Sequence, residues 1–292
     1  SALVLPPLLT GVTAITTLVT AFSFSVFGIS MAAYLAQLIP ALAPFQTPIA
    51  CAVLALFFVI GNSGAKSFAR VLNFLGILKF IALGLFIVFG LFRVQHGGFE
   101  GEPYFISGGT GFLTAVALMS FTCNGATNIV NVAAMAANPK RNIPKAFFTA
   151  SILVAGIYAL LGYVASGIAP YSEVAGQNLG YMAQMVLPEA LYIFFIVGGA
   201  MCSLSTALLG GIGGYTMPIV GTAEDGWLPA FLKKKTNVVL TLAIISILPV
   251  IGGFTLDNIV SMIMVPGMVV GAITNFKAMK MPEMFPNEWA NS

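Results

Sequence analysis

Charged side chains are scarce in this sequence. Asp, Glu, Lys and Arg make up 7% of its 292 residues, whereas 59% are hydrophobic and the mean hydropathy is +0.99. A water-soluble domain needs many more charges to cover its surface, so this composition excludes an ordinary soluble protein. Lipid must be the solvent for most of the chain.

Cysteine and histidine are rare as well. Cys51, Cys123 and Cys202 all lie inside apolar runs, which argues against a disulfide framework and against a zinc site. The single histidine, His96, lies in a predicted outer loop, and no spacing suggests a Ser/His dyad or a metal-ligand cluster. We therefore predict that the protein is not an enzyme and has no metal, no cofactor and no nucleic-acid partner.

Long apolar runs dominate the rest of the sequence. Eight of them have roughly 17 residues or more and are bounded by proline, glycine or charge. They cover residues 9–39, 45–62, 70–93, 111–136, 145–169, 187–221, 237–253 and 258–277. The first is too long for a perpendicular crossing, so we expect it to be steeply tilted or broken near Pro6–Pro7. The pattern predicts an all-α polytopic membrane helix bundle with about eight transmembrane helices.

The basic residues fall on one side of this predicted bundle. Ten of them share that side: Lys66, Arg70, Lys140, Arg141, Lys145, Lys233, Lys234, Lys235, Lys277 and Lys280. The opposite side receives only Arg93, while Lys79 lies inside a helix. By the positive-inside rule the basic side is cytoplasmic, which puts both ends of the chain in the cytoplasm. We expect a multi-pass protein of the cell (plasma) membrane.

Lys79 is a charge within the run 70–93. It lies roughly two to three turns from the cytoplasmic end, which strains an explanation by snorkelling. An ammonium at that depth is costly and is usually retained for a function. One interpretation is a fixed or titratable cation at a coupling-ion position. The other is a lysine that pairs with backbone carbonyls at a helix break.

A second polar feature interrupts the run 111–136. Asn124 and Gly125 are poor helix formers and coincide with Thr122, Thr127 and Asn128. Backbone unwinds at membrane depth only where it lines a cavity or is buried in protein. The free ends of two half-helices can bind a carboxylate and an ammonium, which suits a zwitterionic substrate. The alternative is a simple kink.

Four motifs occur in the connections between these runs. They are Gly61-Asn-Ser-Gly-Ala-Lys-Ser-Phe-Ala-Arg-Val-Leu-Asn73, Asn138-Pro-Lys-Arg-Asn-Ile-Pro-Lys-Ala146, Ala223-Glu-Asp-Gly-Trp-Leu-Pro229 and Lys280-Met-Pro-Glu-Met-Phe-Pro286. In order and spacing they resemble the segments that enter the fifth helix and follow the sixth, eighth and tenth helices of the amino acid–polyamine–organocation (APC) superfamily. The chain thus resembles an APC amino acid permease over nearly its whole length.

The resemblance implies a five-plus-five inverted-repeat transporter fold, here truncated. Residues 1–292 would form a single transmembrane transporter domain. Residues 1–95 resemble helices three to five of the first repeat and residues 108–280 resemble helices six to ten of the second, with 281–292 as a cytoplasmic tail. The expected fragment lacks the first two helices of the family, and the first of these supplies half of the substrate site.

The resemblance also implies site residues. Substrate would bind at the aromatic gate and unwound stretch of the sixth helix: Phe121, Thr122, Cys123, Asn124, Gly125 and Asn128. Lys79 would occupy the position where several sodium-independent members keep a lysine in place of a bound sodium ion. Ser203, Ser205 and Thr206 on the eighth helix are candidates to face it; alternatively, they are plain helix-packing residues.

Together these features predict a sodium-independent secondary active transporter of neutral amino acids. It would work by alternating access in the lipid bilayer, as a permease or exchanger, with either protons or a counter-transported amino acid as the coupled species. The alternatives are a channel-like protein and a non-transporting structural membrane subunit. Uptake of radiolabelled amino acids into proteoliposomes separates these three classes, and replacement of Lys79 by Met tests the coupling role.

Overall fold

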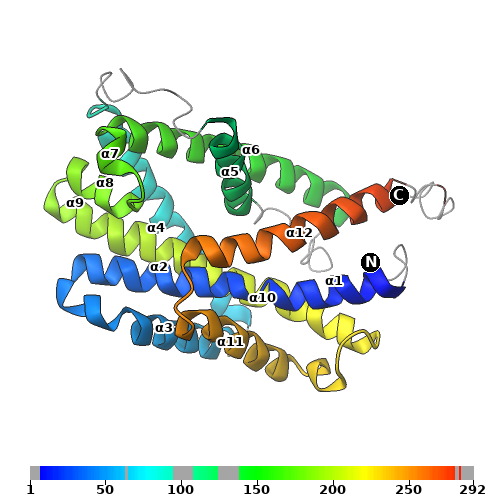
Figure 1. Cartoon of the computed structure of the whole chain (residues 1–292). Helices are drawn as coiled ribbons and strands as arrows, with labels where there is room; N and C mark the ends of the chain where they lie inside the picture. Colours follow the sequence, from blue (N-terminus) through cyan, green and yellow to red (C-terminus); the bar gives the residue numbers. More distant parts are fainter. Residues whose placement is uncertain (1–6, 63–64, 95–107, 124–137, 280–282, 284–292) are drawn as a thin grey trace.

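The computed structural model describes residues 7–62, 65–94, 108–123, 138–279 and 283, which form helices and no strand. The first half of the bundle comprises α1 (Pro7–Val19), α2 (Phe22–Leu38), the 3₁₀ turn η1 (Pro40–Phe45), α3 (Gln46–Asn62), α4 (Ala65–Leu91) and α5 (Gly108–Cys123). The second half comprises α6 (Pro139–Gly167), α7 (Tyr171–Val174), α8 (Leu179–Val186), α9 (Glu189–Phe194), the π-helix η4 (Phe195–Met201), α10 (Cys202–Glu224), the 3₁₀ turn η5 (Ala230–Lys233), α11 (Lys235–Ile251) and α12 (Leu256–Ala278). The predicted all-α bundle is confirmed (Figure 1).

Six helices or helix pairs in the described part of the chain are long and apolar enough to cross a membrane. They cover Thr10–Leu38, Pro40–Asn62, Val71–Leu91, Pro139–Gly167, Glu189–Glu224 and Leu256–Thr274. Each corresponds to one of the eight predicted runs. A seventh run, 237–253, appears as α11, a 17-residue apolar helix. The eighth, 111–136, is described only as far as Cys123.

The first span is interrupted near its middle. α1 begins at Pro7 and ends at Val19, and α2 begins at Phe22, so the interruption lies at Thr20–Ala21 rather than near Pro6–Pro7. Hydroxyl groups cluster at this point. The Oγ1 of Thr20 donates to the carbonyl of Thr17 at 2.5 Å, and the Oγ of Ser23 donates to the carbonyl of Thr20 at 2.6 Å. Such back-bonding competes with the helical ladder and bends helices, which explains the position of the break.

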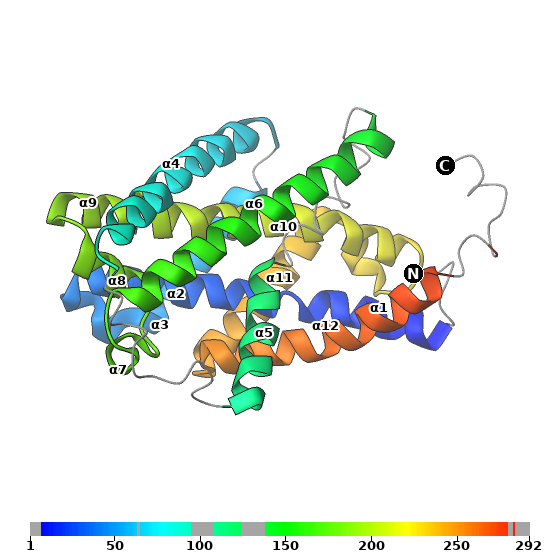
Figure 2. The same ribbon diagram turned by 90° about the horizontal axis from the view of Figure 1, so that it is seen from above.

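The described part of α5 does not run along the bundle. In both ribbon views it crosses the direction of α12, which it contacts (Figures 1 and 2). Its 16 residues are fewer than a perpendicular crossing needs. Residues 124–137, where the sequence predicts the break, lie outside the described residues.

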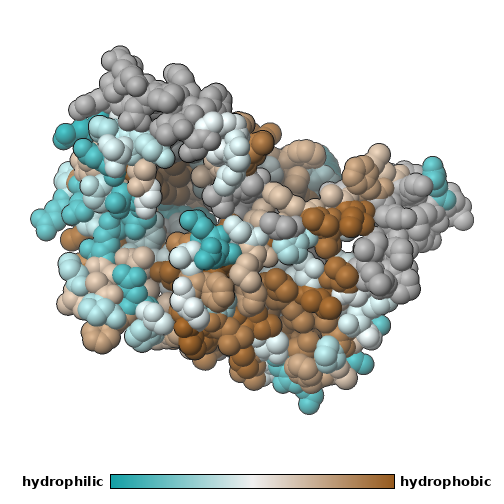
Figure 3. Space-filling view, viewed as in Figure 1, coloured by the Kyte–Doolittle hydropathy of each residue, from teal (hydrophilic) through white to brown (hydrophobic). Residues whose placement is uncertain are grey.

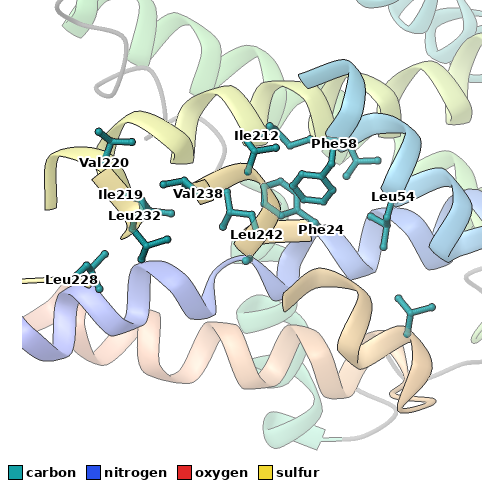
Figure 4. Close-up of a cluster of buried hydrophobic side chains, with 14 of the residues drawn as sticks. Phe24, Leu54, Phe58, Ile212, Ile219, Val220, Leu228, Leu232, Val238 and Leu242 are labelled. Carbon is teal, nitrogen blue, oxygen red and sulfur yellow. The ribbon is translucent and has the colours of Figure 1, made fainter. Parts of the chain in front are cut away.

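Two apolar cores hold the bundle together. The first lies among α2, α3, α10 and α11 and is centred on Phe24 (Figure 4). The ring of Phe24 makes edge-to-face contacts with Phe58, at 5.5 Å between centroids, and with Tyr215, at 6.0 Å. Aromatic pairs favour this geometry because the positive ring edge meets the negative face. The second core joins α4, α6, α8 and α9 with η4, where the rings of Phe86 and Phe195 lie 5.3 Å apart.

The outer surface of the bundle is apolar. Figure 3 shows a broad hydrophobic area over the lower central part of the visible face, where α11 lies. On α11 the exposed large hydrophobic side chains recur every three or four residues: Leu240, Ile244, Leu248 and Ile251. This spacing forms a stripe along one face of a helix whose other face carries Val238, Leu242 and Ser246 into the core. A surface of this kind fits hydrocarbon rather than water, as the composition predicts.

Candidate functional site around Lys79

Lys79 lies in the span Val71–Leu91 of α4, and its side chain is half-buried. Its Nζ donates a hydrogen bond across the bundle to the Oγ1 of Thr206 on α10, at 3.3 Å. The same nitrogen lies 5.5 Å from the centre of the ring of Phe80, within range of a cation–π interaction. The ammonium therefore faces a polar partner on another helix instead of extending toward the end of its own.

Thr206 connects this lysine to the backbone of α10. Its hydroxyl donates its one proton to the carbonyl of Ser203 at 2.8 Å. A hydroxyl has a single donor and two acceptor lone pairs, so Thr206 acts as an acceptor toward Lys79. The result is a short chain of hydrogen bonds from Lys79 through Thr206 to a main-chain carbonyl.

The other two candidates on this helix are placed differently. Ser205 is buried, and its hydroxyl donates to the carbonyl of Met201 at 2.7 Å, within its own helix. Ser203 takes part through its carbonyl. Of the three candidates, the structure thus brings the side chain of Thr206 to Lys79. Ser205 has the contacts of a packing residue.

A π-helical turn precedes these residues and went unpredicted. Residues Phe195–Met201 form η4 within the long span Glu189–Glu224, and the N–H of Cys202 reaches back to the carbonyl of Val197, five residues earlier. A π turn inserts one residue into an α-helix, so the helix beyond it is rotated relative to the helix before it. The direction in which Thr206 faces therefore depends on η4.

Two glycines of η4 bring it against α4. A Cβ on Gly199 would lie 3.1 Å from the Cβ of Ala82, and one on Gly198 would lie 3.4 Å from the Cγ of Leu78. Leu78 and Ala82 flank Lys79 on α4, so the glycine surface of η4 packs on the turn that carries the lysine. In the sequence, the pair Gly198-Gly199 is the feature that indicates this close packing. Apolar residues on every side of this helix hide the extra residue from an analysis by periodicity.

The structure brings together less of the predicted substrate site. Phe121, Thr122 and Cys123 form the last described turn of α5. Asn124, Gly125 and Asn128 lie outside the described residues, as does the predicted unwinding itself. Their role in substrate binding stays a prediction.

A glycine cluster, Gly210-Gly-Ile-Gly-Gly214, lies within the apolar helix α10, where clustered glycines allow close packing or local bending. At Gly211 an added Cβ would lie 2.7 Å from the ring of Phe24, which shows close packing. At Gly210 and Gly214 a Cβ would meet no atom within 4 Å. Close packing is thus found at one of these three positions.

Comparison with known families extends these observations. A family model described as amino acid permease matches residues 1–281, nearly the whole chain. The chain belongs to the amino acid permease family. The predicted resemblance to the APC superfamily is confirmed, and membership of a permease family indicates a transporter rather than an enzyme.

Individual relatives are more distant. The permease-family chain is 28% identical over 133 residues to the vacuolar cationic amino acid transporter 4 of Arabidopsis thaliana, a match of 45% of the chain and 22% of that protein. It is 24% identical over 136 residues to the branched-chain amino acid permease BcaP of Bacillus subtilis, which covers 46% of the chain and 29% of the permease. An uncharacterized protein of Methanocaldococcus jannaschii is 30% identical over 128 residues, 43% of the chain and 29% of that protein. Each match thus spans less than a third of the relative's length.

Proposed function

We propose that this protein is a secondary active amino acid transporter that works by alternating access without a bound sodium ion. The observation that carries the proposal is the hydrogen bond from Lys79 on α4 to Thr206 on α10. In this proposal the amine of Lys79 is a fixed or titratable cation between two apolar spans. A cation in that place can hold the two helices together as a bound metal ion does in a sodium-coupled carrier.

The surroundings of Lys79 support this role. Its recorded polar partner is a neutral hydroxyl. Within the described spans, acidic residues occur at helix ends, at Glu189, Glu224 and Asp257. A charge without a neutralising partner is costly in a membrane and is retained where a function needs it. A proton or a counter-transported amino acid would then be the coupled species.

The proposed substrate is a neutral, zwitterionic amino acid. Its site would be the stretch from Phe121 to Gly125 together with Asn128, where free main-chain ends bind the carboxylate and the ammonium. The scarcity of membrane carboxylates favours a neutral substrate over a basic one. The names of the relatives include both a branched-chain permease and cationic amino acid transporters. We place the protein in the plasma membrane with both ends of this chain in the cytoplasm.

Uptake of radiolabelled amino acids into proteoliposomes tests the proposal. We expect saturable uptake that is accelerated by amino acid on the opposite side and unchanged when potassium replaces sodium. A requirement for sodium would contradict the proposed role of Lys79. Non-saturating ion current would indicate a channel, and the absence of both uptake and current would indicate a structural subunit.

Replacement of Lys79 by Met is the second arm of this test. Met has nearly the length of Lys but removes both the charge and the hydrogen bond. A hydrogen bond to a charged group contributes about 1.5–3 kcal/mol. We expect uptake to fall by at least about tenfold and its pH dependence to change. Lys79→Arg, which keeps the charge, is the control. Unchanged uptake and pH dependence in Lys79→Met would exclude the coupling role.

A further inference from the structure

The connection between α10 and α11 has a fixed conformation. Leu232 is 1% exposed, and it packs with Leu228 into the core around Phe24 (Figure 4). The N–H of Leu232 donates to the carbonyl of Pro229 at 3.0 Å, and the Nδ2 of Asn237 donates to the carbonyl of Phe231 at 2.7 Å. Two buried leucines and two hydrogen bonds therefore hold this segment in place.

The outward side of the same segment is basic and aromatic. Phe231 is 55% exposed although its neighbour Leu232 is buried. Lys233, Lys234 and Lys235 follow directly and are all exposed. We define residues 231–235 as the basic-aromatic turn. The buried leucines orient this turn outward, so its exposure is a consequence of the fold.

The charges of the turn are not neutralised within the described residues. Glu224 and Asp225, at the end of α10, are the acidic residues of this connection, and none of the three lysines has a recorded ion pair. The first turn of α11 contains no acidic residue. Three adjacent exposed ammonium groups form a local positive potential that attracts an anion.

The place of the turn in the bundle indicates what supplies that anion. Exposed apolar side chains lie on both adjoining helices, at Met217 on α10 and Leu240 on α11. The turn thus lies where the hydrocarbon-facing surface ends. Clustered lysines at this level of a membrane attract anionic headgroups, and an exposed Phe beside them can enter the boundary between headgroups and acyl chains. We propose that residues 231–235 bind the phosphate headgroups of anionic phospholipids, with Phe231 placed among the upper acyl carbons.

Fluorescence quenching of Trp227 tests this proposal. Trp227 lies four residues before Phe231, and the sequence contains one other tryptophan, Trp289, which Trp289→Phe removes. The protein is reconstituted in bilayers that contain either brominated phosphatidylglycerol or brominated phosphatidylcholine at equal mole fraction. We expect stronger quenching by the anionic lipid and a preference that weakens as salt is added. Equal quenching by the two lipids would overturn the proposal.

Substitution of the three lysines by Gln tests whether their charges cause the lipid preference. Each lysine near the surface is worth about a fivefold change in lipid affinity, so the triple variant should lose nearly all of the preference. The triple Lys→Arg variant should retain it, which controls for folding. Arg93→Gln, a charge removed at the end of α4, should leave it unchanged. A preference that persists in the triple Gln variant would contradict the proposal.

Free phosphate is the remaining source of the anion. Added inorganic phosphate at the ionic strength of a chloride control should reduce the preference no more than chloride does. A site built for free phosphate would lose its lipid preference selectively in the phosphate arm, and this result would refute a lipid-headgroup site.

Discussion

At the scale of single residues, the contact between Lys79 and Thr206 depends on one hydroxyl group. Thr206→Val keeps the shape of the side chain and removes the acceptor, which leaves the ammonium without its recorded partner. We expect transport to fall by about tenfold or more, and stability to fall by no more than the roughly 1.5–3 kcal/mol that a hydrogen bond to a charged group contributes. Thr222→Val on the same helix, whose hydroxyl bonds within α10, is the control. Equal activities of the two variants in the uptake assay would contradict a role for Thr206.

Gly90 lies at a close contact between α4 and α6. A Cβ added there would overlap the Cγ1 of Val164, which is fully buried. Gly90→Ala should therefore destabilise the protein by about 1–3 kcal/mol through overpacking. Gly84→Ala on the same helix meets no atom within 4 Å and should be neutral or slightly stabilising. Thermal unfolding in detergent measures both, and a neutral Gly90→Ala would show that the two helices separate easily.

The isolated position of Lys79 could be read from the sequence, but the direction in which the side chains of α10 point could not. The isolation of Lys79 in an apolar run was visible in the sequence, because charge in a membrane needs a reason. Which of Ser203, Ser205 and Thr206 faces it was not, because the choice depends on helix rotation. One inserted residue in η4 changes that rotation.

At the scale of elements, η4 sets the distance between α4 and α10. Gly199→Ala requires α4 to move by a few tenths of an ångström, because its Cβ would lie 3.1 Å from that of Ala82. We expect the contact between Lys79 and Thr206 to loosen and uptake to fall several-fold. Comparison of the KM and maximal rate of uptake with the midpoint temperature of thermal unfolding separates this effect from simple destabilisation.

Two glycines on the continuing helix serve as controls for Gly199→Ala. Gly210→Ala meets no atom within 4 Å and should be silent in both assays. Gly211→Ala meets the ring of Phe24 at 2.7 Å and should lower stability without a specific effect on coupling. If Gly199→Ala behaves like Gly211→Ala in both assays, η4 has a packing role alone.

The positions of the helices could be predicted from the sequence more easily than the interruptions within them. Six of the eight predicted runs correspond to spans in the described residues, because apolar length is a strong signal. For the first run the sequence predicted either a steep tilt or a break near Pro6–Pro7, and the interruption lies at Thr20–Ala21. Proline is a conspicuous helix breaker, whereas hydroxyl groups act through hydrogen bonds to carbonyls that a sequence does not display.

At the scale of the whole molecule, the arrangement of charge predicts the sidedness of the chain. In Figure 1 the start of α1, the end of α12 and the connection from α10 to α11 lie at the same end of the bundle. α4 ends at the other, beside α8. The ten basic residues counted on one side in the sequence would put the first of these ends in the cytoplasm.

Labelling of introduced cysteines measures this orientation. In a background without Cys51, Cys123 and Cys202, Arg93→Cys should react with an impermeant maleimide on intact cells. Lys234→Cys should react only after the membrane is opened. The reverse pattern would invert the proposed topology, and reaction of both on intact cells would contradict the span assignment.

The interruption at Thr20–Ala21 has a mechanical consequence. A continuous helix moves as a single rigid element, whereas an interrupted helix can bend at the break. α1 contacts α10 and α12, and α2 contacts the same two helices as well as α3 and α11. A bend at Thr20–Ala21 therefore lets the two segments of this span differ in direction while each stays packed on α10 and α12.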